Sequence, residues 1–241
     1  MDYFFLLVTI VVSILILILA YIKRSIDLSA LLSSSFVGTA ILILIYLRNP
    51  RLWYWIYVVL AFFIFGNLVS KYKFNEKEKN GVEQDIRTFR NVFGNGGSAV
   101  IFSIFYYITN NELFLLGILG SMSTATADTF ATEIGQIYEK NPRLITNLRK
   151  RVRVGTSGAV SLYGTIAAFI GAFLTSSIAI FFNKPVFLAI GIVSGIIGCN
   201  MDSIFGAIFE RDIIDKHMVN FFGTFSGGIS AVLMGFIFKL V

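Results

Sequence analysis

Two acidic residues lie at membrane depth in this sequence. Asp128 and Asp202 each sit inside an apolar segment long enough to cross a bilayer. A carboxylate in a membrane helix costs about 2.5–3.5 kcal/mol on insertion scales, so such residues usually mark a functional site. Mg²⁺ takes one or two carboxylates and completes its coordination with waters and substrate phosphates. We expect both aspartates to be catalytic and to bind Mg²⁺; the alternatives are a hydrogen-bonded Asp128 in a packed helix and a hydrated Asp202 near a helix end.

Three glycine-rich runs are a second candidate for chemistry. We expect each run to begin a membrane helix, where free backbone N–H groups bind anions such as phosphates. None of them has the Gly-Lys-Ser/Thr ending of a Walker A loop. The alternative is that the glycines only allow helices to cross closely. The runs are Asn95-Gly96-Gly97-Ser98, Gly155-Thr156-Ser157-Gly158 and Thr224-Phe225-Ser226-Gly227-Gly228.

Basic side chains stand beside two of these runs. Arg87, Arg90 and Asn91 would share one face of a helix leading into the first run. Lys150 and Arg153 belong to a basic cluster just before the second run. We expect these residues to bind phosphates, with Arg90 also catalytic. The alternative for the cluster is ordinary basic loop residues or contacts with lipid head groups.

Further polar residues complete the expected site. Asp128 and Thr132 share a helix face, whereas Glu133 lies about 140° around the helix from Asp128, so the two carboxylates are not expected to share one ligand. With His217 as its only histidine, the chain offers no convincing Ser-His-Asp or Cys-His arrangement. The residues expected to bind substrate or nucleotide are Arg87, Asn91, Asn95, Gly96, Gly97, Thr129, Glu133, Lys150, Arg153, Gly155, Thr156, Ser157, Gly158, Ser203 and Asn220.

The composition is that of an integral membrane protein. Of the 241 residues, 56% are hydrophobic and only 14% are charged, against about 25% charged in soluble domains. Apolar windows of about 20 residues recur along the chain and leave no room for a separate soluble domain. We expect an all-α helical bundle, a single membrane domain over residues 1–241, with eight transmembrane helices near 3–22, 28–47, 52–70, 95–109, 113–135, 158–181, 186–208 and 220–240.

Two further features bear on the class of protein. The first apolar segment is too long for the core of a signal peptide, so we expect it to remain as a membrane span. Cys199 is the only cysteine, which excludes an intrachain disulfide.

Lysine and arginine predict the orientation of the helices. Most of the 20 basic residues fall in one set of loops, chiefly 70–95 and 136–157. Since basic loops stay in the cytoplasm, we expect a multi-pass cell-membrane protein with these loops cytoplasmic and both termini outside. Asp128 and Asp202 then lie in the cytoplasmic half of their helices, so the active site would face the cytoplasm. These loops, rather than nucleic-acid binding, account for a sequence pI near 9.4.

The second half of the chain looks like an approximate internal repeat. A glycine-rich run leads into an outgoing helix, and the returning helix carries an aspartate, first Asp128 and then Asp202. The run at 224–228 would start a third unit. Such duplication is also common in membrane transporters, so it does not select a function.

Five ordered motifs resemble a known family. They are residues 87–97 (RTFRNVFGNGG), 125–135 (ATADTFATEIG), 142–146 (PRLIT), 155–161 (GTSGAVS) and 202–207 (DSIFGA). They are similar to the membrane family of phytyl phosphate kinase, which includes the eukaryotic transmembrane protein 19 and many archaeal and cyanobacterial members. The resemblance covers nearly the whole chain from about residue 29. It implies transfer of a phosphoryl group from a nucleoside triphosphate, CTP in particular, to an isoprenoid monophosphate.

The candidate site residues agree with the expected phosphoryl transfer, and they leave two alternative functions open. A monophosphate acceptor has a second pKa near 6 and is already ionised, so it needs little help from a general base. Catalysis would then consist of positioning and charge neutralisation. A cytidylyltransferase acting on a lipid phosphate would use the same groups. A transporter of an anionic solute would also use intramembrane acids and broken helices.

Overall fold

The chain folds into a bundle of long helices with a small sheet at one end. The computed structural model describes residues 2–79, 81, 86–182, 184–210 and 213–240. The long helices are α1 (Asp2–Ile22), α2 (Leu28–Arg48), α3 (Ile56–Lys71), α5 (Phe89–Thr109), α6 (Leu113–Tyr138), α7 (Leu162–Ser176), α8 (Pro185–Phe209) and α9 (Lys216–Ile237). The short elements are η1 (Pro50–Trp55), α4 (Phe74–Lys79), η2 (Ser177–Phe182), β1 (Arg143–Leu144), β2 (Asn147–Arg151) and β3 (Ala159–Val160).

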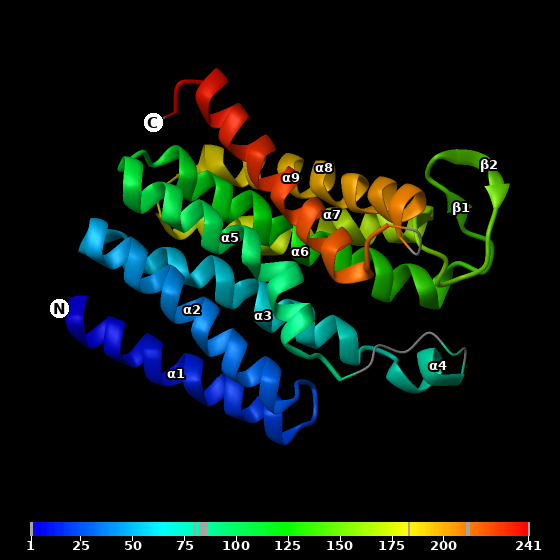
Figure 1. Cartoon of the computed structure of the whole chain (residues 1–241), viewed down its shortest axis with the longest axis horizontal. Coiled ribbons are helices and arrows are strands. Elements are labelled where there is room, and N and C mark those ends of the chain that lie inside the picture. The colour runs from blue at the N-terminus through cyan, green and yellow to red at the C-terminus, as the bar shows by residue number, and fades with distance from the viewer. Residues whose placement is uncertain (1, 80, 82–85, 183, 211–212, 241) are drawn as a thin grey trace.

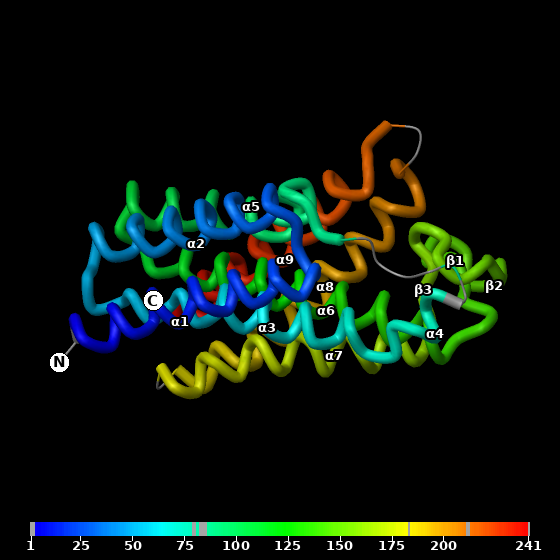
Figure 2. Tube along the Cα trace, turned by 90° about the horizontal axis from the view of Figure 1, so that it is seen from below, coloured from blue at the N-terminus to red at the C-terminus, as the bar shows by residue number. Residues whose placement is uncertain are grey.

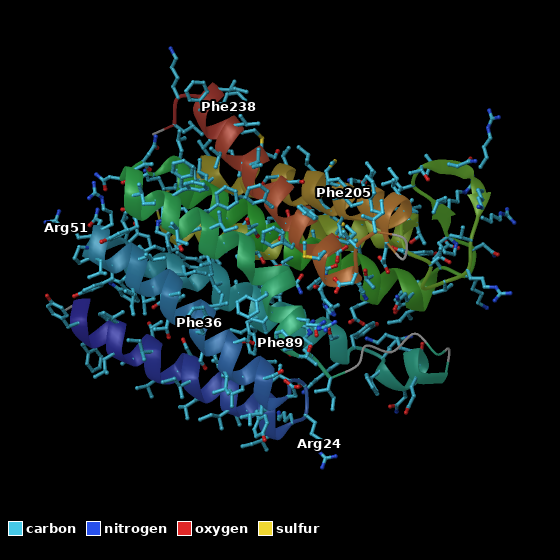
Figure 3. All side chains as sticks on the ribbon, viewed as in Figure 1. Arg24, Phe36, Arg51, Phe89, Phe205 and Phe238 are labelled. Carbon is cyan, nitrogen blue, oxygen red and sulfur yellow. The ribbon has the colours of Figure 1, made fainter. Side chains whose placement is uncertain are left out.

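The expected helical membrane fold is confirmed. Within the described residues, eight helices are long and apolar enough to cross a membrane, with η1 extending α3 and η2 extending α7. Large apolar side chains face outward, such as Phe36 of α2 and Phe238 just after α9, each 63% exposed (Figure 3). Exposure of this kind suits contact with lipid chains. The three strands pair antiparallel in the order β2-β1-β3 and occupy only the connection between α6 and α7.

Two helices begin earlier than expected, which changes the meaning of their glycine-rich runs. Thr88 caps α5 through a capping box with Asn91, so the run at 95–98 lies in the second and third turns of that helix. Asp215 caps α9 by accepting a hydrogen bond from the Met218 amide, so the run at 224–228 lies about three turns inside. The third run, 155–158, stands in the loop before α7, whose cap is Ser161. The prediction that all three runs begin helices was wrong.

Helix α6 occupies the middle of the bundle. It contacts α3, α5, α7, α8 and α9. In the 18-residue apolar stretch that marks it as a candidate membrane span, 83% of the residues are buried inside the protein, whereas the share for α1 is 6%. Figure 1 shows α1 along the outer edge beside α2, and Figure 2 shows the sheet beyond one end of the helices. We call the end of the bundle that carries the sheet the hairpin end. Helices α3, α6 and α8 finish there, and α5, α7 and α9 start there.

Small residues bring the central helices close together. An added Cβ on Gly227 of α9 would lie 1.9 Å from Thr124 Oγ1 of α6, and one on Gly120 of α6 would lie 2.5 Å from the Gly227 carbonyl oxygen. Hydroxyl pairs join the same layers: Ser123 with Ser176 at 2.9 Å, and Ser98 with Thr224 at 2.9 Å. Close packing and interhelical hydrogen bonds are the main sources of helix association in lipid. The alternative reading of these glycines, close crossing, is the one that the geometry supports.

A buried ion pair holds the connection between α3 and α5 against α6. Lys77 of α4 is fully buried and donates to Glu133 of α6 and to the Ser70 carbonyl oxygen at 2.6 Å. Tyr72 at the end of α3 also meets Tyr138 of α6, with 2.8 Å between their hydroxyl oxygens. A buried charge needs such a partner, because desolvation is costly. Glu133, which was expected to bind substrate or nucleotide, is thus paired with Lys77 and does not line the polar pocket described below.

The close crossing of α6 and α9 gives a stability prediction. Gly227→Ala places a methyl group against Thr124, so we expect it to destabilise the protein by about 1–3 kcal/mol through overpacking. The measurement is the thermal unfolding midpoint in a mild detergent. The matched control is Gly38→Ala on α2, where nothing lies within 4 Å of the new Cβ. Equal midpoints for the two variants would contradict the crossing.

Candidate active site

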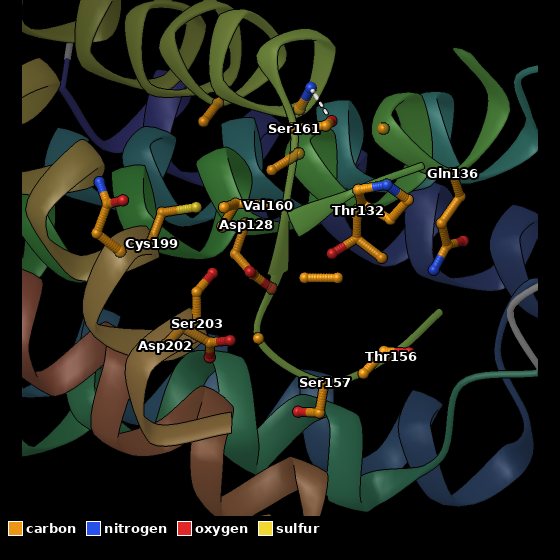
Figure 4. A pocket seen from close by; sticks show the side chains of 18 of the residues that line it. Asp128, Thr132, Gln136, Thr156, Ser157, Val160, Ser161, Cys199, Asp202 and Ser203 are labelled. Carbon is orange, nitrogen blue, oxygen red and sulfur yellow. Dashed lines mark hydrogen bonds between the residues drawn. The ribbon is translucent and has the colours of Figure 1, made fainter. Parts of the chain in front are cut away.

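A polar pocket opens among α6, α7, α8 and α9 at the hairpin end. Its volume is about 190 Å³. Asp128, Asp202, Ser203 and Ser157 surround one space (Figure 4). The pocket is lined by the last turns of α6 and α8, by the loop that precedes α7, and by the first turns of α7 and α9. Segments that lie far apart in the sequence thus meet at one depth.

Both aspartates come from helices that end at this side of the bundle. Asp128 lies on α6 ten residues before its end, and Asp202 lies on α8 seven residues before its end. Asp202 is held closely by α9, because an added Cβ on Gly223 would lie 2.7 Å from its Cβ atom. Each aspartate is only partly buried. The carboxylates are thus fixed by packing and still reach the pocket.

The loop at 154–161 forms the wall opposite the aspartates. Gly155 and Gly158 adopt φ values of 84° and 73°, which other residues rarely adopt. An added Cβ on Gly158 would also lie 2.7 Å from the Ser203 carbonyl oxygen, so the loop backbone rests on α8. Ser157 donates its hydroxyl proton to Glu210 at the end of α8. The glycines therefore serve both the turn of the loop and its close approach to α8.

Two helix starts also face the pocket. Ser161, Gly164 and Thr165 line it from the first turn of α7, and Lys216 and Asn220 line it from α9. The N-terminus of a helix carries a partial positive charge and favours anions. Lys216 adds a full positive charge at the same level. This side of the pocket can therefore receive phosphate groups.

The charges of the pocket favour a cation together with its anion. Among the described lining residues, Asp128, Asp202 and Glu210 carry carboxylates and Lys216 carries a positive charge. A free polyphosphate would be repelled by the acids, whereas a complex with a divalent cation would not. Within the described part of the chain, no group of three or more His, Cys, Asp or Glu residues is placed to hold a metal. The two aspartates suit Mg²⁺, because that ion keeps waters and substrate phosphates as its other ligands.

Eight of the expected site residues line this pocket. They are Asp128, Gly155, Thr156, Ser157, Gly158, Asp202, Ser203 and Asn220. Glu210, Lys216 and Gln136 also line it and were missed. Lys216 directly follows the helix cap Asp215, and that cap was the available signal. Gln136 lies two turns beyond Asp128 on α6, and helical spacing could have indicated it.

The other expected residues lie elsewhere. Arg90 is exposed, 3.9 Å from Asp215, and Lys150 and Arg153 are exposed near the sheet. Thr129 donates to the Ala125 carbonyl oxygen at 2.7 Å. Gly97 packs against Phe221 of α9. None of these lines the polar pocket.

The residues around the first glycine run line a different cavity. Arg87, Asn91, Asn95 and Gly96 border a space among α1, α2, α3 and α5. Arg87 precedes α5 and is paired with Ile26 in a β-bridge, so it does not share a helix face with Arg90. It is buried and donates to Ser70 Oγ at 2.9 Å and to the Gly66 carbonyl oxygen at 3.3 Å. Burial lowers the pKa of this guanidinium from its ordinary value.

Similarity to known proteins agrees with this architecture. The chain is 34% identical over 214 residues to an uncharacterised membrane protein of Methanocaldococcus jannaschii. The aligned region covers 88% of this chain and 87% of the relative. An uncharacterised membrane protein of Synechocystis is 32% identical over 188 residues, covering 73% of this chain and 71% of the relative. The chloroplast protein VTE6 of Arabidopsis thaliana is 31% identical over 191 residues, covering 73% of this chain and 57% of VTE6. The chain thus spans little more than half of VTE6.

The family follows from a match that covers almost the whole chain. No solved structure matches the sequence. Residues 11–238 match the family described as Integral membrane protein DUF92. This confirms the membrane family that the motifs indicated. The chain belongs to the DUF92 family of integral membrane proteins.

Proposed function

We propose that this protein is a membrane phosphotransferase that moves the γ-phosphoryl group of a nucleoside triphosphate, CTP in particular, to an isoprenoid monophosphate. Family membership, the kinship with VTE6 and the resemblance of five motifs to phytyl phosphate kinase support the reaction class. The observation that carries the proposal is the polar pocket. It sets Asp128 and Asp202 opposite a glycine-containing loop and two helix starts.

The residues divide the work by charge. Asp128 and Asp202 would hold Mg²⁺, which would neutralise the charge of the triphosphate when bound. Lys216 and the start of α7 contact the phosphate oxygens and neutralise charge that develops on them. Thr156, on the loop at 155–158, lines the same pocket, and its hydroxyl can donate to these oxygens. Such a site positions its reactants and needs no histidine.

The proposed transfer balances without a further reactant. An oxygen of the lipid monophosphate attacks the γ-phosphorus, and the bond between that phosphorus and the β–γ bridging oxygen breaks. The electron pair leaves with the nucleoside diphosphate, and the lipid becomes a diphosphate. The acceptor is largely a dianion at neutral pH, because its second pKa is near 6. Its attacking oxygen therefore carries no proton that a base must remove.

The location of the pocket suits a lipid acceptor and a soluble donor. It lies at the hairpin end, where exposed basic residues such as Lys150 and Arg153 gather. Basic loops are retained in the cytoplasm, so we propose that this end faces the cytoplasm of a cell membrane. A nucleotide can then reach the pocket from water while the acceptor chain stays in the bilayer.

The direct test is an assay of purified protein in lipid nanodiscs. Each of CTP, ATP, GTP and UTP is combined with Mg²⁺ and geranylgeranyl or phytyl monophosphate, and the products are identified by mass spectrometry. The proposal expects a lipid diphosphate and a nucleoside diphosphate, fastest with CTP. A lipid carrying CMP with release of pyrophosphate would instead identify a cytidylyltransferase. Anion flux into liposomes with no lipid product would identify a transporter.

The two aspartates give a prediction about turnover. Asp128→Asn and Asp202→Asn each remove a ligand for the cation, so we expect kcat to fall by about 100-fold or more. Replacing a charge at membrane depth should leave the unfolding midpoint unchanged or higher. The matched control is Glu112→Gln at the other end of α6, outside the pocket, with near wild-type turnover. Full activity in either asparagine variant would refute the assigned role.

Lys216 gives a prediction that separates the pocket from the basic loops. Lys216→Gln removes the positive charge facing the triphosphate, so we expect the nucleotide KM to rise about tenfold, equivalent to about 1.4 kcal/mol. Lys150→Gln is the matched control: it removes the same charge from exposed strand β2, and its KM should stay within about twofold of wild type. Initial rates at varied nucleotide concentration measure both. The reverse order of effects would place the nucleotide at the sheet instead.

A further inference from the structure

A second cavity, of about 170 Å³, lies among α1, α2, α3 and α5. Most of the side chains that line it are apolar. They include Ile14, Val37, Leu42, Leu60 and Phe63. An apolar cavity of about 150 Å³ in a protein core stays dry and binds benzene. A space of this size therefore holds one or two isoprene units of a longer chain.

One end of this cavity is polar and positively charged. Arg87, Asn91 and Asn95 line it at the hairpin end, and the described lining residues include no carboxylate. Arg87 keeps its hydrogen bonds to α3, and its charge still lies beside the cavity. An occupant with an apolar chain and an anionic head matches this distribution of groups.

The two cavities meet at an amide pair. Asn95 lines the apolar cavity and Asn220 lines the polar pocket, and Asn220 Nδ2 lies 3.5 Å from Asn95 Oδ1. This long hydrogen bond runs from α9 to α5 and joins one lining residue of each cavity. A head group beside Asn95 would therefore lie next to the polar pocket.

Helix α1 offers a lateral way in from the bilayer. It forms one wall of the apolar cavity through Thr9, Ile10 and Ser13. It is also the least buried of the candidate spans in the described residues, because only 6% of its 18-residue apolar stretch is buried inside the protein. A hydrogen bond joins α1 to α3, with 2.9 Å between the hydroxyl oxygens of Thr9 and Tyr57. A lipid chain can displace a helix that is held so lightly more easily than it can displace α6.

We propose that the apolar cavity binds the hydrocarbon chain of the isoprenoid monophosphate, with its phosphate at the Arg87–Asn95 end, facing the nucleotide pocket. This inference rests on the proposed function and assigns the lipid half of the site. It gives the motif at 87–97 the role of receiving the acceptor, whereas the polar pocket receives the donor. The two phosphates then lie on either side of the Asn95–Asn220 pair, whose long hydrogen bond must open for the acceptor oxygen to reach the γ-phosphorus.

Gly38 provides a probe of the cavity. It lines the cavity from α2, and nothing lies within 4 Å of an added Cβ, so Gly38→Phe fills the space without a clash at the backbone. We expect the KM for geranylgeranyl monophosphate to rise about tenfold or more, because the phenyl ring occupies the space proposed for the hydrocarbon chain. The matched control is Leu32→Phe on the outer face of the same helix, where Leu32 is 63% exposed. Equal KM values for the long acceptor in both variants would overturn the inference.

A binding measurement separates this inference from the proposed reaction. Wild type and the two variants are irradiated with a farnesyl monophosphate that carries a terminal diazirine, and adducts are mapped by mass spectrometry. Adducts on α1, α2 or α3 that Gly38→Phe removes and Leu32→Phe retains support the cavity even if no phosphoryl transfer is found. Adducts only on other helices overturn it even if transfer occurs.

Discussion

The cost of placing carboxylates at membrane depth constrains this structure. Asp128 and Asp202 lie on helices that cross the bilayer, and each needs water, a cation or a donor within reach. The fold meets this need by placing both near the ends of α6 and α8, in a pocket that opens at the hairpin end. Around them the helices must pack closely enough to exclude lipid. The small residues of α6, α8 and α9 make that packing possible.

The elements most accessible to sequence reasoning were those with a long, uniform signal. Eight apolar stretches predicted eight spans, and the helices agree with them apart from their ends. Helix ends are set by single caps such as Thr88 and Asp215, which hydropathy does not register. For that reason two glycine-rich runs were taken as helix starts, although they lie inside α5 and α9. Glycine serves anion binding and close packing equally well, and spacing alone does not separate the two.

Residues of the candidate site could be predicted where their type is unusual in a membrane helix. They could not be predicted where the side chain that faces them lies far away in the sequence. The two aspartates and the 155–158 loop were singled out for their types, and the structure brings them to one pocket. Glu133 is an equally rare intramembrane acid, but Lys77 of the short helix α4 pairs with it across 56 positions of sequence. Lys216 and Glu210 flank a loop that reads as ordinary charged sequence. Only the folded chain shows which of these charges face the pocket.

The two cavities suit the proposed transfer of a phosphoryl group from a water-soluble nucleotide to a lipid phosphate. One is polar and carries acids, a lysine and two helix starts, while the other is apolar with a cationic end. They adjoin at the hairpin end of the bundle, through α5 and α9. A donor and an acceptor can therefore approach from different phases. The central small-residue helix α6 fixes the polar pocket, and the lightly held α1 leaves the apolar one accessible.

The central claim is that Asp128 and Asp202 together hold a divalent cation that also contacts the nucleotide phosphates. It is tested most directly by pulsed electron paramagnetic resonance of Mn²⁺ bound to the protein with CTP, read through its coupling to phosphorus nuclei. The account predicts a phosphorus coupling typical of direct phosphate coordination, which disappears from the protein-bound fraction in Asp128→Asn and in Asp202→Asn. Protein-bound Mn²⁺ that shows no phosphorus coupling, or that binds undiminished in both variants, would contradict it.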